Sequence, residues 1–436
     1  MQKLKLLSTR TISETRTMAV LAVLAFVAGM AAGAIGAAFR YTLERADALR
    51  AMIVAESASH PVLVPIVMVI GAAVASALAA WLVRRFSPDA AGSGIPHVEA
   101  VLEGALPPSS ARLIPVKFAG GVLAIGSGLA LGREGPSVQM GVTAAHIIGG
   151  LFRRNKEDRR ALIAGGAGAG LATAFNAPGA GAIFVLEELV GRFDARIGLV
   201  ALGASVGAIT VSRGMIGNEL DFQVADMTSG GIAGLLLFLL FGLFAGLLSV
   251  GHNRYLLATL TFAERIGGPI ELRAAAVGAV VGLLAWCTPH LVGGGDSITQ
   301  SALNGGMVLA VLPAIFLFRM VLGAASYAAG TPGGLFAPLL VLGAVSGLAF
   351  GYVAEAAIPG LTVRPEAFAL VGMGAFFAGA IRAPLTGLIL VIEMTGSSSL
   401  LLPLLAGCFG AMLVAETFRE PPIYESLKQR AARSER

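Results

Sequence analysis

Three glycine- and proline-containing frames interrupt apolar sequence in this chain, at residues 92–96, 132–136 and 334–338. A helix that begins in such a frame presents unpaired N–H groups and roughly half a positive charge, which suits transient binding of an anion. Glu134 lies in the second frame. A carboxylate in apolar surroundings is costly unless paired or protonated, so it is a functional candidate. The frames comprise Gly92, Ser93, Gly94, Ile95 and Pro96; Gly132, Arg133, Glu134, Gly135 and Pro136; and Gly334, Leu335, Phe336, Ala337 and Pro338.

The chain also contains an internal repeat. Residues 174–187 read AFNAPGAGAIFVLE and residues 380–393 read AIRAPLTGLILVIE, with Ala, Ala, Pro, Gly, Ile, Val and Glu at matching places. The second and third frames have the same separation of about two hundred residues, so they belong to the same duplication. Interrupted apolar segments at matching positions of two halves indicate a transport site near the middle of a membrane.

Two acids lack an acidic counterpart in the repeat. Glu134 and Glu188 both align with apolar residues of the second half, whereas the glutamate before Glu188 is shared by both copies. Shared architecture explains the common glutamate, and the two unmatched acids are therefore the better functional candidates. Two structural alternatives stay open: an ion pair between Glu134 and Arg133, and a solvated helix end that pairs Glu188 with Arg192.

The composition is that of an integral membrane protein. Of the 436 residues, 56% are hydrophobic and 13% are charged, against roughly 25% charged residues in soluble domains. Several apolar stretches are long enough, or nearly so, to cross a hydrocarbon core of about 30 Å. We expect spans near residues 17–39, 61–83, 161–186, 197–212, 229–251, 273–289, 307–329, 335–355 and 398–415, with interrupted segments near 118–131, 137–152 and 366–394.

The net charge of +5 does not indicate nucleic-acid binding, because the basic residues lie at the chain ends and in short loops, where they act as topology signals. Their positions predict a plasma membrane protein with both termini cytoplasmic, although Arg40, Arg45 and Arg50 after the first span weaken the count. The topology signals are Lys3, Lys5, Arg10 and Arg16; Arg84 and Arg85; Arg153, Arg154, Lys156, Arg159 and Arg160; and Lys428, Arg430, Arg433 and Arg436.

The repeat divides the chain into two related helical halves. We expect a cytoplasmic N-terminal segment at 1–16, a first repeat at 17–217, a connection at 218–229, a second repeat at 230–418 and a pore-lining turn with a cytoplasmic tail at 419–436. The glycine run at 165–170 (GGAGAG) is interpreted as a helix-packing surface, since no strand precedes it and no phosphate-binding lysine follows.

Together these motifs resemble the CLC family of chloride channels and proton-coupled chloride transporters. GSGIP, GREGP and GGLFAP (residues 333–338) stand in the family's order and approximate spacing, and Tyr424 follows near the C-terminus. The resemblance spans nearly the whole chain. It implies an all-α, multi-span membrane protein with two inverted-topology halves, whose broken helices meet at the membrane midplane. It also implies a homodimer in the lipid bilayer, with one pathway per subunit, in a bacterial inner membrane.

The resemblance further implies the roles of individual residues. Ser93 and Tyr424 would place hydroxyls against a central chloride ion, and the backbone amides of Leu335 and Phe336 would complete its shell. Glu134 would be the external gate, which occupies a chloride position when ionised and swings away when protonated. Glu188 would be the internal proton-transfer acid of the family's exchangers.

The predicted function is therefore a proton-coupled chloride antiporter, and the alternative is a passive chloride channel. No enzyme activity is expected. An intramembrane hydrolase based on Ser93 would need a histidine base, and His97 follows Ser93 too closely along one helix to serve as one. No histidine or cysteine pair has metal-ligand spacing, so no metal is expected. Chloride and protons are the transported ligands, with no cofactor, nucleotide or nucleic acid.

Overall fold

The computed structural model describes the backbone of residues 2–225, 227–358, 360 and 362–434, and side chains from residue 18 to residue 433 with the same internal gaps. The side chains of Lys3, Lys5, Arg10, Arg16 and Arg436, which were part of the topology prediction, lie outside the described residues. In the described part the chain forms α-helices and turns, and its only β-type pairs are two isolated bridges. The prediction of an all-α fold is confirmed.

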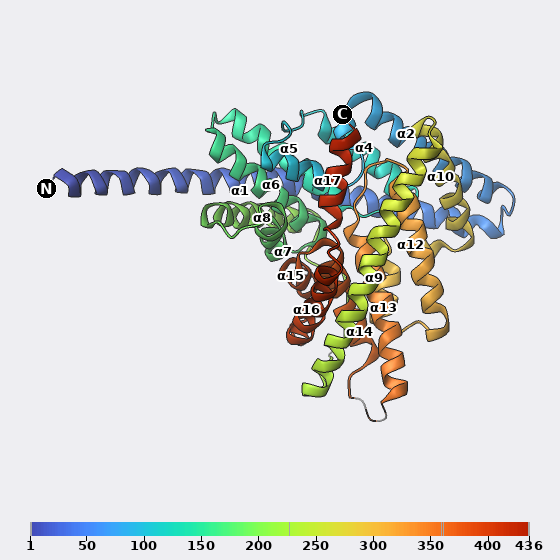
Figure 1. Ribbon diagram of the computed structural model, residues 1–436. Helices are drawn as coiled ribbons and strands as arrows, with labels where there is room; N and C mark the ends of the chain where they lie inside the picture. The colour runs from blue at the N-terminus through green and yellow to red at the C-terminus, as the bar shows by residue number, and fades with distance from the viewer. Residues whose placement is uncertain (1, 226, 359, 361, 435–436) are drawn as a thin grey trace.

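The helices follow one another in two similar series (Figure 1). Each series contains long helices interrupted by short ones, and the short α3 and α7 of the first series match the short α11 and α15 of the second. The first series is α1 (Gln2–Ala55), α2 (Leu63–Phe86), α3 (Ile95–Glu103), α4 (Leu113–Gly126), α5 (Glu134–Leu151), α6 (Lys156–Phe175), α7 (Pro178–Phe184) and α8 (Ala195–Ile216). The second is α9 (Gly231–Ile266), α10 (Ile270–Cys287), α11 (Asp296–Leu303), α12 (Leu312–Ala328), α13 (Phe336–Ala357), α14 (Pro365–Ile381), α15 (Pro384–Thr395), α16 (Leu401–Thr417) and the final α17 (Ile423–Ser434).

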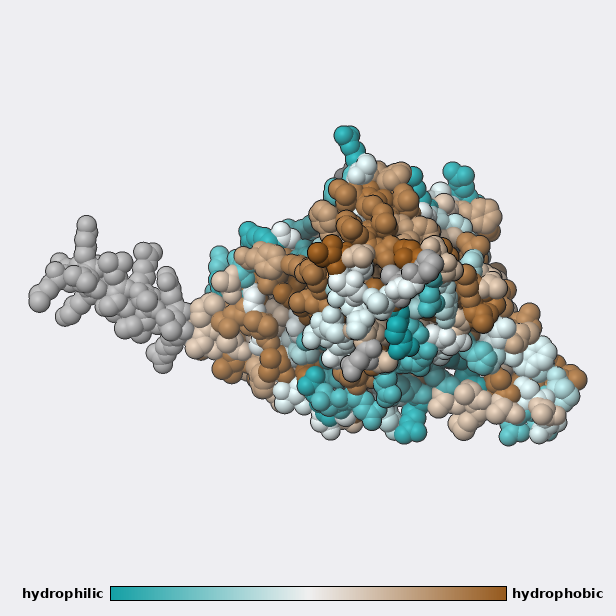
Figure 2. All heavy atoms as spheres, turned by 90° about the horizontal axis from the view of Figure 1, so that it is seen from below, coloured by the Kyte–Doolittle hydropathy of each residue, from teal (hydrophilic) through white to brown (hydrophobic). Residues whose placement is uncertain are grey.

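Seven of the described helices are long and apolar enough to cross a membrane: α1 from Met18 onward, α2, α8, α9, α10, a segment containing α12, and α13. Their outward faces carry large apolar side chains, which lipid tails can cover without cost. Figure 2 shows broad apolar areas on one face of the molecule, with hydrophilic residues gathered in part of it. The prediction of a multi-span membrane protein is confirmed.

One expected span is wrong. The apolar stretch 161–186 is not a single crossing helix, because α6 ends at Phe175 and α7 begins at Pro178. Asn176 between them has a left-handed backbone with φ of 51°, and Arg382 at the equivalent break between α14 and α15 has φ of 75°. In each half an Ala-Pro pair follows this residue, and proline restricts the residue before it to a non-helical conformation. The repeated sequence therefore encodes a repeated helix break.

Close helix packing explains the glycine run at 165–170. A methyl group at Gly166 of α6 would lie 2.5 Å from the backbone oxygen of Gly141 on α5, so the two helices approach at a distance that only glycine allows. Small residues permit such contact between helices in a membrane, where no hydrophobic force from water drives their association. The interpretation of this run as a packing surface is confirmed.

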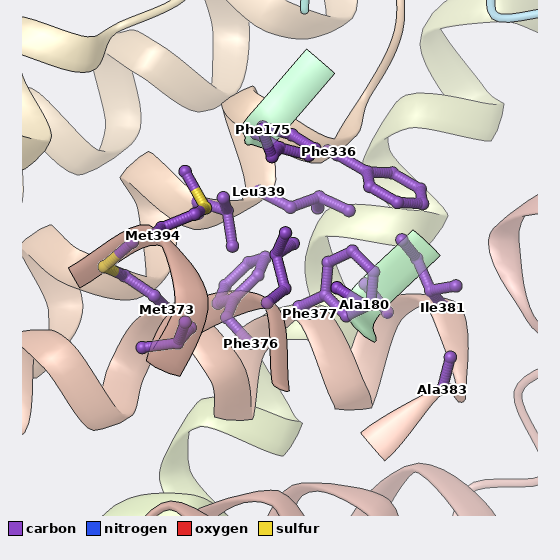
Figure 3. Close-up of a cluster of buried hydrophobic side chains, with 14 of the residues drawn as sticks. Phe175, Ala180, Phe336, Leu339, Met373, Phe376, Phe377, Ile381, Ala383 and Met394 are labelled. Atoms are coloured by element: carbon purple, nitrogen blue, oxygen red, sulfur yellow. The ribbon is translucent and has the colours of Figure 1, made fainter. Parts of the chain in front are cut away.

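A cluster of buried aromatic and aliphatic side chains surrounds Phe336, the first residue of α13 (Figure 3). The ring of Phe336 packs against Phe377 at 4.7 Å between centroids, Phe184 at 5.6 Å and Tyr424 at 5.8 Å. These residues come from α7, α13, α14 and α17, and all four are fully buried. The cluster therefore fixes the beginning of α13 relative to both halves of the chain.

Candidate functional site

The three glycine frames meet in the interior of the protein. The Gly132 amide donates to the Gly334 oxygen at 2.9 Å, and the Gly334 amide donates back to the Gly132 oxygen at 2.7 Å. The first frame joins the same locus, because Gly92 donates to the Thr331 oxygen at 3.2 Å and accepts from Gly333 at 3.0 Å. Segments more than two hundred residues apart are thus connected by backbone hydrogen bonds, as the repeat led us to expect.

Each frame is the start of a helix. The described structure begins α3 at Ile95, α5 at Glu134 and α13 at Phe336. Gly94, which precedes α3, has a left-handed φ of 84°, a conformation that glycine adopts without strain. The first amides of these helices have no carbonyl partner within their own helix. Their positive ends therefore converge on one buried locus that favours negative charge.

The Glu134 carboxylate already occupies this locus. The side chain is fully buried, and its Oε1 accepts a hydrogen bond of 2.6 Å from the Phe336 amide at the start of α13. Its Oε2 has no hydrogen-bond partner among the described residues. The carboxylate lies between Gly132 and Gly334, and a methyl group at either glycine would overlap it. An acid on α5 thus binds the positive end of α13.

Two hydroxyl groups lie at the same locus. Ser93 and Tyr424 are fully buried, and neither hydroxyl oxygen has a hydrogen-bond partner among the described residues. Ser93 adjoins the start of α5, since a methyl group at Gly135 would lie 2.6 Å from its Oγ. Tyr424 contacts the ring of Phe336. Buried hydroxyls without partners are costly, so both groups have an unused donor at this locus. Leu335, the residue before α13, is also buried.

Lys117 binds the backbone at the start of the first frame. Its ammonium group is fully buried and donates to the oxygens of Ala90 at 3.0 Å and Gly92 at 2.8 Å. The structure shows it holding the backbone of the frame that carries Ser93.

Sequence reasoning missed the counterpart of this lysine. Buried Arg319 on α12 donates to the oxygens of Leu291, Gly293 and Gly294 at 3.1, 2.9 and 3.0 Å, and so holds the loop before α11. The signal was available. The offset that aligns Glu134 with Phe336 is 336 − 134 = 202, and the same offset aligns Lys117 with Arg319, since 319 − 117 = 202.

Glu188 lies on a second, separate pocket. It is half-buried on a single π-helical turn, Val185–Leu189, that follows α7. The structure shows no ion pair between Glu188 and Arg192 in the described part of the chain, and Arg192 is exposed. We name this space of about 370 Å³ the tail pocket, because α17 forms one wall; its charged lining is Glu99, Glu103, Arg160, Glu187, Glu188, Arg382, Glu425 and Lys428.

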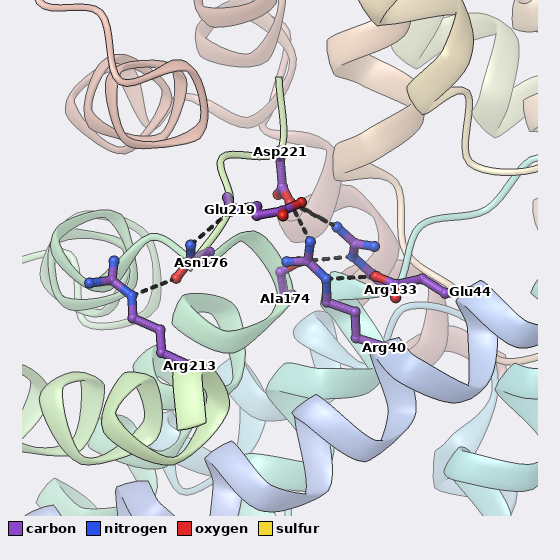
Figure 4. Close-up of polar contacts among 8 residues, drawn as sticks. All are labelled: Arg40, Glu44, Arg133, Ala174, Asn176, Arg213, Glu219 and Asp221. Carbon is purple, nitrogen blue, oxygen red and sulfur yellow. Dashed lines mark hydrogen bonds and ion pairs between the residues drawn. The ribbon is translucent and has the colours of Figure 1, made fainter. Parts of the chain in front are cut away.

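A third polar space borders Gly132 and Arg133, the two residues before Glu134. This linker pocket, about 210 Å³, reaches Gly132 and Ala337 and is bordered by the segment that joins the two halves. Asp221 of that segment binds Arg40 and Arg133 (Figure 4). The sequence-derived pairing of Arg133 with Glu134 is therefore not what the structure shows, because the Arg133 guanidinium contacts Asp221 and the Ala174 oxygen instead.

Comparisons with known proteins agree with this geometry. The model of the family described as "Voltage gated chloride channel" matches residues 75–416. The H(+)/Cl(-) exchange transporter ClcA of Yersinia pestis bv. Antiqua (strain Angola) is 37% identical over 428 residues, covering 96% of this chain and 89% of that protein. The ClcA of Vibrio parahaemolyticus serotype O3:K6 is 39% identical over 365 residues, covering 82% of this chain and 78% of that one.

Solved structures show the same architecture. The crystal structure of a slow cyanobacterial Cl−/H+ antiporter superposes with a TM-score of 0.91 at 34% sequence identity, covering 95% of this chain and 99% of the other. A eukaryotic CLC transporter shares the fold, with a TM-score of 0.80 at 22% identity over 95% of this chain and 74% of that chain. The frames, the helix breaks and these similarities together place the chain in the voltage-gated chloride channel (CLC) family.

Proposed function

We propose that the protein is an antiporter that exchanges chloride for protons across a membrane, with Glu134 as its external gate and Glu188 as its internal proton-transfer acid. The observation that carries this proposal is the Glu134 carboxylate at the start of α13, where its oxygen accepts the Phe336 amide at 2.6 Å. An ionised carboxylate and a chloride ion compete for the same helix end. Protonation removes the charge that holds the side chain there, so each proton taken up opens a place for an anion.

The chloride site lies at the start of α13, where the ionised Glu134 carboxylate also binds. Amides of Leu335 and Phe336 and the hydroxyls of Ser93 and Tyr424 replace the water hydrogen bonds that the ion loses on entering the membrane. Four neutral donors hold an anion without a full positive charge, which suits an ion that must also leave. Lys117 stabilises this arrangement, because both of its observed hydrogen bonds go to backbone oxygens at or near the frame that contains Ser93.

Proton movement needs a second acid. Glu188 borders the tail pocket, which several charged side chains line and through which water can reach it. Protons enter at Glu188 and pass to Glu134 through the interior, while chloride takes its own route past Tyr424. The relatives named above as H(+)/Cl(-) exchangers support coupled exchange over the alternative, a passive chloride channel.

The wider setting follows from the family and the charge distribution. We assign the tail pocket and both chain termini to the cytoplasmic side, and the linker pocket to the outer side, of a bacterial inner membrane. The protein works there as a homodimer with one pathway per subunit. Chloride and protons are its ligands, it needs no metal, cofactor or nucleotide, and it catalyses no covalent reaction.

The decisive experiment uses the purified protein in liposomes with chloride concentrated on one side. An antiporter drives protons against their own gradient as chloride runs down, and a pH electrode in the bath records this as a pH change that a proton carrier abolishes. Chloride flux with no accompanying proton movement would establish the channel instead. Absence of chloride flux in monodisperse protein would reject both functions.

A further inference from the structure

The segment that joins the two halves carries a carboxylate that contacts Arg133, the residue before the outer gate Glu134. We propose that Asp221 is a positioning residue for Glu134: it holds the Arg133 guanidinium beside the start of α5 and offsets positive charge at the mouth of the linker pocket. This inference rests on the proposed exchange function, because it concerns how readily the gate exchanges a proton for chloride.

The contacts of Asp221 are direct. Its side chain is 5% exposed, and one oxygen lies 2.8 Å from the Arg40 guanidinium on α1. The Arg133 guanidinium lies 3.5 Å from both carboxylate oxygens, and its Nε donates to the Ala174 oxygen at 2.8 Å. Arg133 is the residue immediately before Glu134. Asp221 therefore fixes the side chain adjacent to the gate from outside the gate's own helix (Figure 4).

The backbone around Asp221 is held independently of this ion pair. The Glu219 oxygen accepts from Asn176, and the Phe222 amide donates to the Met394 oxygen at 3.0 Å. Gln223 exchanges two hydrogen bonds with Gln300, at 3.0 and 2.8 Å. The connecting segment is thus attached to the first half just before Asp221 and to the second half just after it. Replacing the carboxylate by an amide should leave the segment in place and change mainly the charge.

The charges that face this site come from several elements. The charged residues that border the linker pocket or adjoin it are Arg40, Glu44 and Asp47 on α1, Arg133 just before α5, Glu134 on α5, Asp296 on α11, and Glu219 and Asp221 of the connecting segment. Only Asp221 contacts both guanidiniums in the described part of the chain. Removing its charge leaves two cations without their shared partner and makes the potential at Glu134 more positive. Chloride is attracted more strongly to the mouth of the pocket by that change, while the ionised form of Glu134, which competes with chloride for the start of α13, persists to lower pH.

The test compares variants reconstituted in liposomes, with transport followed against pH and against chloride concentration. For Asp221→Asn we expect the apparent KM for chloride to fall roughly two- to tenfold, the scale of one unit charge acting through a partly solvated pocket. The acid limb of the exchange profile should move to lower pH. Asp221→Glu should restore both values towards those of the unaltered protein.

Two further variants separate positioning from net charge. Glu219→Gln removes one negative charge from the same pocket, but the Glu219 side chain is exposed and forms no ion pair in the described part of the chain, so its effect should be less than half that of Asp221→Asn. Arg40→Gln removes a cation from the pocket and keeps the ion pair between Asp221 and Arg133, so the KM for chloride should rise. Equal effects of Asp221→Asn and Glu219→Gln, or no effect of Asp221→Asn, would overturn the proposal.

Folding and function are controlled separately. If Asp221→Asn is not monodisperse, the opposite shifts expected for Arg40→Gln and the restored profile of Asp221→Glu decide the question. If the unaltered protein moves chloride without protons, the exchange function fails, and yet the KM comparison still tests whether Asp221 controls anion entry.

Discussion

Glu187 and Glu393 form a reciprocal pair of helix caps: Glu393 caps the start of α7, and Glu187 caps the start of α15. Glu393, on α15, accepts hydrogen bonds from the Gly179 and Ala180 amides in the first turn of α7, at 2.9 and 2.8 Å. Glu187, on the π-helical turn that continues α7, accepts from the Leu385 and Thr386 amides in the first turn of α15, at 2.9 and 2.6 Å. The repeat conserves both acids because each half supplies the cap of the other.

This reciprocity predicts a stability cost for removing either carboxylate. Glu187→Gln and Glu393→Gln should each lower the free energy of unfolding by roughly 1–2 kcal/mol, the usual value of a charged cap at buried amides. Thermal unfolding in detergent measures the effect. Glu157→Gln is the matched control, since Glu157 is an exposed acid in a surface ion pair and should change little. A stable Glu393→Gln would mean that the capping bonds do not contribute to stability.

Replacing the gate acid should separate the two ion fluxes. Glu134→Gln keeps the size of the side chain and removes its charge. The neutral glutamine side chain binds the backbone N–H of Phe336 less strongly than the carboxylate does, so chloride gains access to that N–H. We expect chloride flux in liposomes to continue and proton pumping to disappear. The gate assignment fails if Glu134→Gln still moves protons against a gradient when chloride runs down.

The glycines around the gate give an independent test of where the carboxylate lies. For Gly132, the three closest atoms to an added methyl group all belong to the Glu134 side chain. Gly132→Ala should therefore expel the carboxylate from the start of α13 and weaken coupling at least severalfold, measured as protons moved per chloride. In a Glu134→Ala background the same substitution should have little further effect on chloride flux. Equal effects in both backgrounds would place the clash elsewhere.

The sequence was sufficient to predict the fold class and the meeting of the frames. The duplication around 174–187 and 380–393, with glycine frames at matched positions, implied two helical halves that share one site, and the backbone bonds between Gly132 and Gly334 confirm that meeting. A repeat carries this information because equivalent residues occupy equivalent places in the two halves. The roles assigned to Glu134, Glu188, Ser93 and Tyr424 stay predictions, which the experiments above address.

Contacts between non-equivalent parts of the chain were less accessible. The ion pair of Arg133 with Asp221 could not be predicted, because no local pattern shows which distant acid a buried arginine meets. The break inside 161–186 was missed because hydropathy alone does not show that Asn176 takes a left-handed backbone. The role of Arg319 was missed for a different reason: its alignment with Lys117 is present in the sequence, but a single arginine in an apolar helix does not show which backbone oxygens it binds.

The second proton acid should be separable from its neighbour. Glu188→Gln should abolish proton coupling and leave chloride flux and thermal stability nearly unchanged, because Glu188 borders the tail pocket and caps none of the helices that the structure describes. Glu187→Gln should show the reverse, with lower stability and normal coupling in the folded fraction. Parallel measurements of proton flux and unfolding on both variants test this contrast. Identical behaviour of the two would remove the reason to assign proton transfer to position 188 alone.

The amides of the last helix, α17, should exchange with solvent more readily in acid. Lys428 on α17 contacts Glu99, Glu103 and Glu425, and its hydrogen bond lowers the pKa of Glu425 below the usual value. For Lys428, partial burial lowers the pKa, but the hydrogen bonds to Glu103 and Glu425 outweigh that effect and raise it.

A depressed carboxyl pKa stabilises the folded state above the unfolded value of about 4.3. That contribution is lost as pH falls through the lower, folded value. The raised lysine pKa contributes below about 10.4 and is lost only as pH rises above that range. We therefore expect hydrogen exchange of the α17 amides to accelerate, relative to the rest of the chain, below about pH 4. Glu425→Gln should flatten this dependence, whereas Glu355→Gln on α13 should not.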